Sequence, residues 1–196
     1  MGRSVCDPNP QRGGGALIFK QTPLAGLYVV EPEILTDDRG LFARTYCERE
    51  FSNQGLSLRI VQCNVSSNRL KGTLRGLHYQ KDPHGEVKLV TCTRGAIYDV
   101  AVDLRRASPT FAKWFGIVLS AENRLMLYVP EGFAHGFQTI TDDVELFYQM
   151  SQFYVSEAAA GVRWNDPQIG LKWPFPDPIL SPRDRSLPLL DDLSDL

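Results

Sequence analysis

Short segments in which every second residue is apolar constrain the fold of this chain more than any other feature. The clearest runs from Val144 to Met150, where alternate residues would share one face of a strand. Further strand candidates are Thr73–Gln80, Val87–Thr93, Ile97–Leu104, Phe111–Leu119 and Arg124–Val129. Turn-forming residues such as Pro130-Glu-Gly132 separate them. Many short strands at spacings of roughly 10–15 residues predict an all-β fold, a jelly roll of the sandwich or barrel type.

Helical segments are few and short. Only Cys47–Gln54 favours a helix. From Asn165 onward the chain is rich in proline, and its aromatic residues, such as Trp173, need surfaces to pack against. We therefore expect this tail to wrap around the barrel as ordered coil.

The two ends of the chain differ in character from its centre. Residues 1–15 contain Asp-Pro-Asn-Pro and three consecutive glycines, which predicts a flexible N-terminal arm. The composition from there on is uniform and shows no linker. Residues 16–196 are therefore predicted to form one jelly-roll domain.

Composition excludes several classes of protein. The formal net charge is -2 and the basic residues are scattered, which argues against a nucleic-acid partner. No apolar stretch approaches the roughly 20 residues that span a bilayer, and the N-terminus lacks the apolar centre of a signal peptide. The four cysteines include no C-x-x-C pair, so neither a disulfide framework nor a zinc site is expected. These features predict a cytoplasmic protein without a membrane association.

The chain has three histidines, and two of them lie in informative contexts. Pro130–His135 (PEGFAH) resembles the second half of the cupin signature, P-x-G-x-x-H. Metal-binding cupins pair that half with an earlier H-x-H, but here His78 is followed two residues later by Gln80. The remaining ligands are too few for zinc or iron. We predict a cupin-like barrel with no metal and no other cofactor.

Four side chains could instead carry acid–base chemistry. His78 and Arg75 share a strand, Lys88 lies on the next strand, and Tyr148 lies on a later one. A neutral imidazole can take a proton, a cation can stabilise the resulting anion, and a phenol can return a proton from the other side. Each residue alone could also be structural, so spacing by itself predicts only a β-barrel with a polar pocket.

Several phrases, in order, resemble the dTDP-4-dehydrorhamnose 3,5-epimerase family from about residue 18 to Leu190. The matching phrases are Asp37–Gly40 (DDRG), Leu74–Gln80 (LRGLHYQ), Lys88–Val90 (KLV), Asp99–Arg105 (DVAVDLR), Ser108–Phe111 (SPTF), Leu119–Asn123 (LSAEN), Val129–Phe137 (VPEGFAHGF), Trp164–Pro167 (WNDP) and Leu180–Asp184 (LSPRD). The resemblance implies a cupin-type jelly roll that works without metal, usually as a dimer. It also implies inversion of C3, C5 or both in a nucleotide-diphosphate-linked 4-keto-6-deoxy sugar.

The same resemblance assigns catalytic roles to four residues. It implies that His78 is the base, that Asp184 polarises it, that Lys88 stabilises a C4 enolate, and that Tyr148 is the acid. These roles fit the acid–base chemistry inferred from the residue types alone.

Other matched positions would hold the substrate. The resemblance places Arg39 and Arg75 on the diphosphate, where a guanidinium fork fits phosphate oxygens. The remaining implied substrate contacts are Gln62, Asn64, His135, Arg183 and Tyr154, the last stacking on the nucleotide base. Arg44 is also predicted at this ligand-holding edge.

The chain departs from the family pattern mainly at that edge. Arg44 and Ala159 replace two glutamates, and Arg183 replaces a lysine. Cys63 and Val65 replace an aspartate and a histidine. The nucleotide and the number of inverted carbons are therefore left open.

Three alternatives remain. One is a single-centre epimerase acting on a CDP- or GDP-linked sugar. Another is a non-catalytic jelly roll that binds sugar nucleotides, which would have little need for all four catalytic-type residues. The third is a metal-dependent cupin oxygenase, disfavoured by Gln80.

Overall fold

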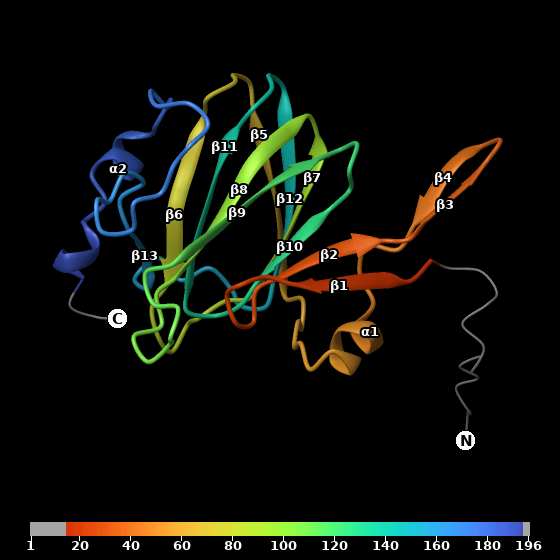
Figure 1. Cartoon of the computed structure of the whole chain (residues 1–196), viewed down its shortest axis with the longest axis horizontal. Helices are drawn as coiled ribbons and strands as arrows, with labels where there is room; N and C mark the ends of the chain where they lie inside the picture. Colours follow the sequence, from red (N-terminus) through yellow and green to blue (C-terminus); the bar gives the residue numbers. More distant parts are fainter. Residues whose placement is uncertain (1–14, 194–196) are drawn as a thin grey trace.

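Two antiparallel sheets stacked face to face form the body of the protein, which confirms the predicted all-β jelly roll (Figure 1). The computed structural model describes residues 15–193. The six-stranded sheet has the order β1 (Leu17–Gln21), β2 (Tyr28–Pro32), β10 (Met126–Val129), β7 (Lys88–Arg94), β12 (Val144–Met150) and β5 (Gln62–Asn68). The five-stranded sheet has the order β13 (Ala159–Gly161), β6 (Leu74–Gln80), β11 (Phe133–Thr139), β8 (Ala96–Asp103) and β9 (Trp114–Ser120).

Three apolar clusters hold these layers together. The central cluster lies between the sheets and joins residues of both, such as Leu127 of β10 and Phe137 of β11. A second cluster packs helix α1 (Glu48–Asn53), through Phe51, against the outer face of the six-stranded sheet. The third packs the tail against the outer face of the five-stranded sheet. No helix within residues 15–193 is long and apolar enough to cross a membrane.

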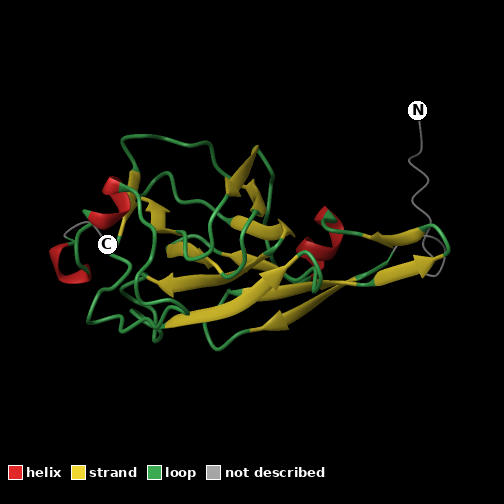
Figure 2. Cartoon of the chain, turned by 90° about the horizontal axis from the view of Figure 1, so that it is seen from above, coloured by secondary structure: helices red, strands yellow, loops and turns green. Residues whose placement is uncertain are grey.

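A separate two-stranded hairpin extends away from the body of the protein, as Figure 1 and Figure 2 show. It consists of β3 (Ile34–Asp37) and β4 (Gly40–Ala43). Its turn contains Gly40 at a φ of +125°, a conformation that favours glycine. Both strands are mostly exposed, so nothing else in the described chain covers this hairpin.

The strand candidates from the alternation pattern all correspond to observed strands, but several observed strands were not predicted. β11 was missed because all seven of its residues are buried, which leaves no polar–apolar alternation to detect. β5 was missed for the opposite reason, since it is short of apolar residues and largely exposed. The predicted helix is observed one residue shorter at each end.

The proline-rich tail is ordered and lies against the five-stranded sheet, as predicted. The indole of Trp173 donates to the carbonyl of Trp164 at 2.9 Å and packs in the third cluster. Gln138 of β11 binds both backbone groups of Phe175, at 2.9 and 3.0 Å. The tail also forms the short helices α2 (Pro182–Arg185) and η1 (Leu190–Asp192). The predicted arm lies outside the described residues except for Gly15, and the single-domain organisation stays a prediction.

Candidate active site

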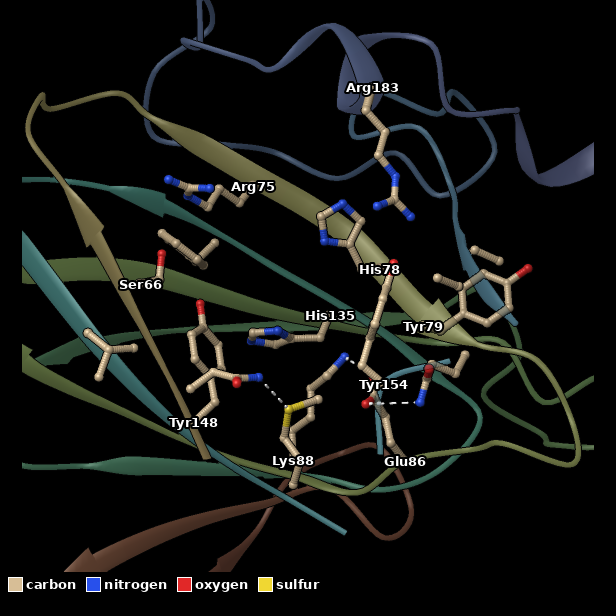
Figure 3. A pocket seen from close by; sticks show the side chains of 17 residues that line it. Ser66, Arg75, His78, Tyr79, Glu86, Lys88, His135, Tyr148, Tyr154 and Arg183 are labelled. Atoms are coloured by element: carbon tan, nitrogen blue, oxygen red, sulfur yellow. Dashed lines mark hydrogen bonds and ion pairs between the residues drawn. The ribbon is translucent and has the colours of Figure 1, made fainter. Parts of the chain in front are cut away.

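A cavity of about 360 Å³ opens between the two sheets and gathers most of the predicted site residues (Figure 3). Its volume is in the range of small-molecule sites. Strands of both sheets line it, and the tail contributes Arg183. The lining residues are Asn64, Val65, Ser66, Arg75, His78, Tyr79, Gln80, Glu86, Lys88, His135, Phe137, Tyr148, Met150, Tyr154, Ala159, Ala160 and Arg183.

A close approach of β6 and β11 brings two histidines into this cavity. Gly76 has a φ of +128°, and an added Cβ would lie 2.6 Å from the Cα of Gly136. Only glycine fits there, which accounts for the glycine in the LRGLH phrase. Two residues further along β6, His78 pairs in register with His135 of β11, and both line the cavity.

His78 and Asp184 form a hydrogen-bonded pair at the wall made by β6. His78 Nε2 lies 2.7 Å from Asp184 Oδ1, and the imidazole is 38% exposed whereas the carboxylate is 6% exposed. Burial would raise the pKa of Asp184, but hydrogen bonds with His78, the backbone of Gly76 and Ser181 lower it below its ordinary value. An ionised Asp184 holds the imidazole proton on Nε2 and leaves the lone pair on Nδ1.

The local sequence of the tail explains how Asp184 reaches His78. Ser181 caps helix α2, with Pro182 at the first helical position. The Ser181 hydroxyl accepts a hydrogen bond from the backbone N–H of Asp184 at 3.0 Å. This short helix contacts β6, so its single buried residue, Asp184, faces the imidazole.

Tyr148 lies on β12, in the sheet that faces the strand of His78, and both side chains enter the same cavity (Figure 3). Burial raises the pKa of Tyr148 strongly, and the carboxylate of Asp99 raises it further, while Arg75 and Ser66 oppose this only in part. The phenol therefore stays protonated at neutral pH and can donate a proton. The cavity thus has a side chain that can accept a proton on one wall and a side chain that can donate one on the opposite wall.

Lys88 and Glu86 form a buried ion pair in the cavity. The Lys88 Nζ lies 2.7 Å from Glu86 Oε1, with side chains 9% and 7% exposed. The ammonium therefore lies beside the space between the two walls, where it could stabilise an anion.

His135 is held by a second buried carboxylate. Its Nε2 lies 2.8 Å from Asp99 Oδ1, and its ring meets that of Tyr148 edge to face at 6.2 Å. Within the described residues, Asp99 Oδ2 accepts no hydrogen bond. No group of three or more His, Cys, Asp or Glu side chains in residues 15–193 is arranged to hold a metal ion.

The remaining predicted contacts surround the mouth of the cavity. Arg75 Nε donates to Asn68 Oδ1 at 2.7 Å, which aims the guanidinium along the wall. Tyr154 is exposed but lines the cavity, and its backbone N–H donates to Gln62 Oε1 at 3.2 Å. Gln62 thus supports the rim without lining the cavity, whereas Asn64 and Arg183 line it directly.

Two of the predicted residues lie elsewhere in the chain. Arg39 stands at the tip of the β3–β4 hairpin, pairs with Asp37, and has a side chain that is 89% exposed. Arg44 pairs with Glu50 of helix α1. The structure of a single chain therefore does not bring either arginine to the cavity.

Sequence reasoning missed Ser66 and Glu86 as cavity residues. Each stands two positions from a predicted one, Ser66 after Asn64 and Glu86 before Lys88. A spacing of two places residues of an extended segment on one side, so this signal was available. Neither residue belongs to a motif of its own.

The sequence matches a known family over most of its length. The model of the dTDP-4-dehydrorhamnose 3,5-epimerase family covers residues 21–192. An enzyme of that name from Methanothermobacter thermautotrophicus is 45% identical over 172 residues, covering 86% of this chain and 91% of the relative. A dTDP-4-dehydrorhamnose 3-epimerase from Streptomyces niveus is 39% identical over 173 residues, covering 88% of this chain and 83% of the relative.

Solved structures agree with this match. The dTDP-4-dehydrorhamnose 3,5-epimerase of Elizabethkingia anophelis superposes with a TM-score of 0.88 at 41% identity, covering 92% of this chain and 99% of the other. A dTDP-6-deoxy-D-glucose-3,5-epimerase of Legionella pneumophila, in complex with dTDP-4-keto-L-rhamnose, gives 0.86 at 36% identity, covering 91% and 95%. On these grounds, and with the cavity residues arranged as described, the chain belongs to the dTDP-4-dehydrorhamnose 3,5-epimerase family.

Proposed function

We propose that this protein is a carbohydrate epimerase that inverts C3, C5 or both carbons of a dTDP-linked 4-keto-6-deoxy sugar. Family membership supports the reaction class. The ligand of the Legionella structure supports the class of substrate. The observation that carries the proposal is the placement of His78 and Tyr148 on opposite walls of one cavity. Inversion requires proton removal from one face of a carbon and proton return to the other.

The first half of the reaction is proton removal. His78, neutral and oriented by Asp184, takes the proton from a carbon beside the C4 ketone. The resulting imidazolium is stabilised by the ionised Asp184. The electron pair moves to the ketone oxygen, and the Lys88 ammonium stabilises this enolate in a site with little water.

The second half is proton return. Tyr148 donates its phenolic proton to the carbon from the opposite wall, so the centre is inverted when the ketone reforms. The raised pKa of Tyr148 keeps that proton in place until the enolate forms.

Substrate binding is assigned to the residues around the mouth of the cavity. Arg75 and Arg183 supply positive charge for the diphosphate. Tyr154, exposed at the rim, offers a surface on which the nucleotide base can stack. The polar groups of Asn64 and His135 face the sugar, and Gln62 supports Tyr154.

We further propose that the active form is a homodimer in which each hairpin reaches the other subunit. The β3–β4 hairpin exposes Ile34, Leu35, Leu41 and Phe42, an apolar surface that favours association. Arg39 at its tip is assigned to the diphosphate by family resemblance but does not line the cavity of its own chain. A second copy would cover the apolar hairpin and receive Arg39.

Mixing two inactive variants tests this arrangement. We expect Arg39→Ala to weaken substrate binding and His78→Ala to abolish turnover. Dimers formed from an equal mixture regain up to about a quarter of wild-type activity, because half of them contain both chains and one intact site. The rate is measured at low substrate concentration after the chains are co-refolded.

Arg75→Ala provides the matched control for this mixing experiment. Arg75 lines the same cavity as His78. In a mixed dimer of Arg75→Ala and His78→Ala, each site therefore lacks one of the two residues, and no activity returns. Failure of the Arg39→Ala mixture to recover, when Arg39→Ala alone is impaired, would place Arg39 in its own subunit's site.

Proton NMR in deuterated water with dTDP-4-keto-6-deoxyglucose tests the proposed activity. Loss of both the C3 and C5 proton signals supports a double epimerase. Loss of one signal supports a single-centre enzyme, the activity named for the Streptomyces niveus 3-epimerase. If neither this sugar nor its CDP- and GDP-linked analogues exchange protons, the proposal fails in favour of another substrate or a binding module.

We also propose that the protein is cytoplasmic. The three described cysteines are all free thiols, which fits a reducing cytoplasm. The absence of a nucleic-acid partner and of a membrane association stay predictions from composition.

A further inference from the structure

We infer that Glu86 is a positioning residue for catalysis, which holds Lys88 in place as a charged ammonium facing the substrate. The inference rests on the proposed epimerase function, since Lys88 acts there on the enolate. Glu86 is almost fully buried, lines the cavity, and takes no part in the proton transfers described above.

Burial of the Lys88 side chain makes a counter-charge necessary. A buried ammonium without a counter-charge tends to lose its proton, because burial favours the neutral form. Glu86 Oε1 lies 2.7 Å from Lys88 Nζ, so the carboxylate compensates the charge that burial disfavours. Only a protonated Lys88 can neutralise an enolate, and Glu86 is the carboxylate that pairs with it.

The Glu86 carboxylate is itself held in place by Gln80. Its other oxygen, Oε2, lies 3.4 Å from Gln80 Nε2. Gln80 is buried and also donates to the carbonyls of His84 and Phe153, both at 3.1 Å. Its own Oε1 accepts from the backbone N–H of Val155 at 2.7 Å. Glu86 is thus fixed through β6, which limits the directions that Lys88 can adopt.

The same anchor links Lys88 to the rim of the site. The segment held by Gln80, through Phe153 and Val155, carries Tyr154 between its two attachment points. Tyr154 is the proposed platform for the nucleotide base. Buried Gln80 therefore helps to position two groups. One is the Lys88 ammonium, proposed to face the sugar, and the other is the Tyr154 ring, proposed to stack on the nucleotide base.

The pH dependence of the reaction separates this role from a purely structural one. The other titratable or charged groups lining the cavity are Arg75, His78, Tyr79, His135, Tyr148, Tyr154 and Arg183. Tyr148 keeps its proton far into the alkaline range because its pKa is raised. With Tyr148 protonated, a change of the alkaline limb caused by a Glu86 substitution tests whether this carboxylate keeps Lys88 charged.

The test is the pH profile of kcat for Glu86→Gln, measured by deuterium exchange into the sugar. We expect the alkaline limb to move down by about one pH unit or more, so that on this limb kcat falls by up to about tenfold relative to wild type. Near pH 6.5 the difference should be much smaller. Circular dichroism and thermal melting establish that the variant is folded.

Three further variants test whether the effect of Glu86→Gln is specific to its charge and passes through Lys88. Glu31→Gln is the matched control, because Glu31 pairs with Lys20 on the protein surface, and we expect a wild-type profile. Glu86→Asp keeps the charge on a shorter side chain, so the limb should stay in place while kcat falls roughly tenfold or more through misplacement of Lys88. In a Lys88→Met background, Glu86→Gln should add little further loss, because its effect passes through Lys88.

Either of two results overturns the inference. One is an unshifted alkaline limb in a folded Glu86→Gln variant. The other, which also applies if Glu86→Gln does not fold, is a wild-type kcat in Glu86→Asp. Absence of exchange by the wild-type protein would instead remove the proposed function, so the two failures are distinguishable.

Discussion

Replacement of His78 by alanine is expected to lower the rate of C–H proton exchange in the sugar by about 10³-fold or more, within the range of general-base catalysis. The nucleotide end of the substrate is held by other residues, so its Kd should change little. The loss is expected because His78 Nε2 is bound to Asp184, which leaves the lone pair of His78 Nδ1 as the proposed base in the cavity. Exchange is followed by proton NMR in deuterated water, and binding by calorimetry with dTDP.

His84→Ala is the matched control for this experiment. His84 does not line the cavity, and only its backbone carbonyl takes part in the network around Gln80. We expect near-wild-type exchange in that variant. Turnover retained in full by His78→Ala would remove His78 from the role of base.

Replacement of Tyr148 by phenylalanine is expected to separate proton removal from inversion. His78 and Lys88 remain, so deuterium should still enter the original face of the carbon, at a rate within about tenfold of wild type. Formation of the inverted product should fall by about 10²-fold, because the opposite wall has lost its proton donor. Product stereochemistry is determined by NMR after the exchange reaction.

Tyr128→Phe controls for the loss of a buried phenol. Tyr128 packs in the cluster beneath helix α1, and its hydroxyl donates to the carbonyl of Ser57 at 3.1 Å. Burial also raises its pKa, to about 12, yet it lies outside the cavity. That variant should keep both exchange and inversion. Inverted product formed at the wild-type rate by Tyr148→Phe would exclude Tyr148 as the acid.

Three carboxylates each pair with a basic side chain of the cavity. Asp184 supports His78, Glu86 supports Lys88, and Asp99 supports His135. Each pair fixes the orientation of a basic side chain, and the carboxylate of each pair is buried. A site of this kind can move a proton and stabilise an enolate without large rearrangement of charge.

Much of the fold followed from local pattern. The alternation in Val144–Met150 predicted β12 with its observed bounds, since one face of that strand packs into the core. β11 could not be found in this way, because the core covers one of its faces and the tail contributes to covering the other. Burial on both sides removes the polar half of the pattern.

The sequence by itself determined the strands with one polar face, the family, and the residue types of the acid–base site. Family resemblance implied that Asp184 polarises His78, but only the tertiary structure shows how two residues 106 positions apart meet, because packing of the tail on β6 sets that contact. It also decided that the Glu86 side chain is paired and buried, and that Arg39 does not line the cavity of its own chain. The reason is physical: local periodicity reports which face of a strand is covered, whereas a site depends on which distant segments cover it.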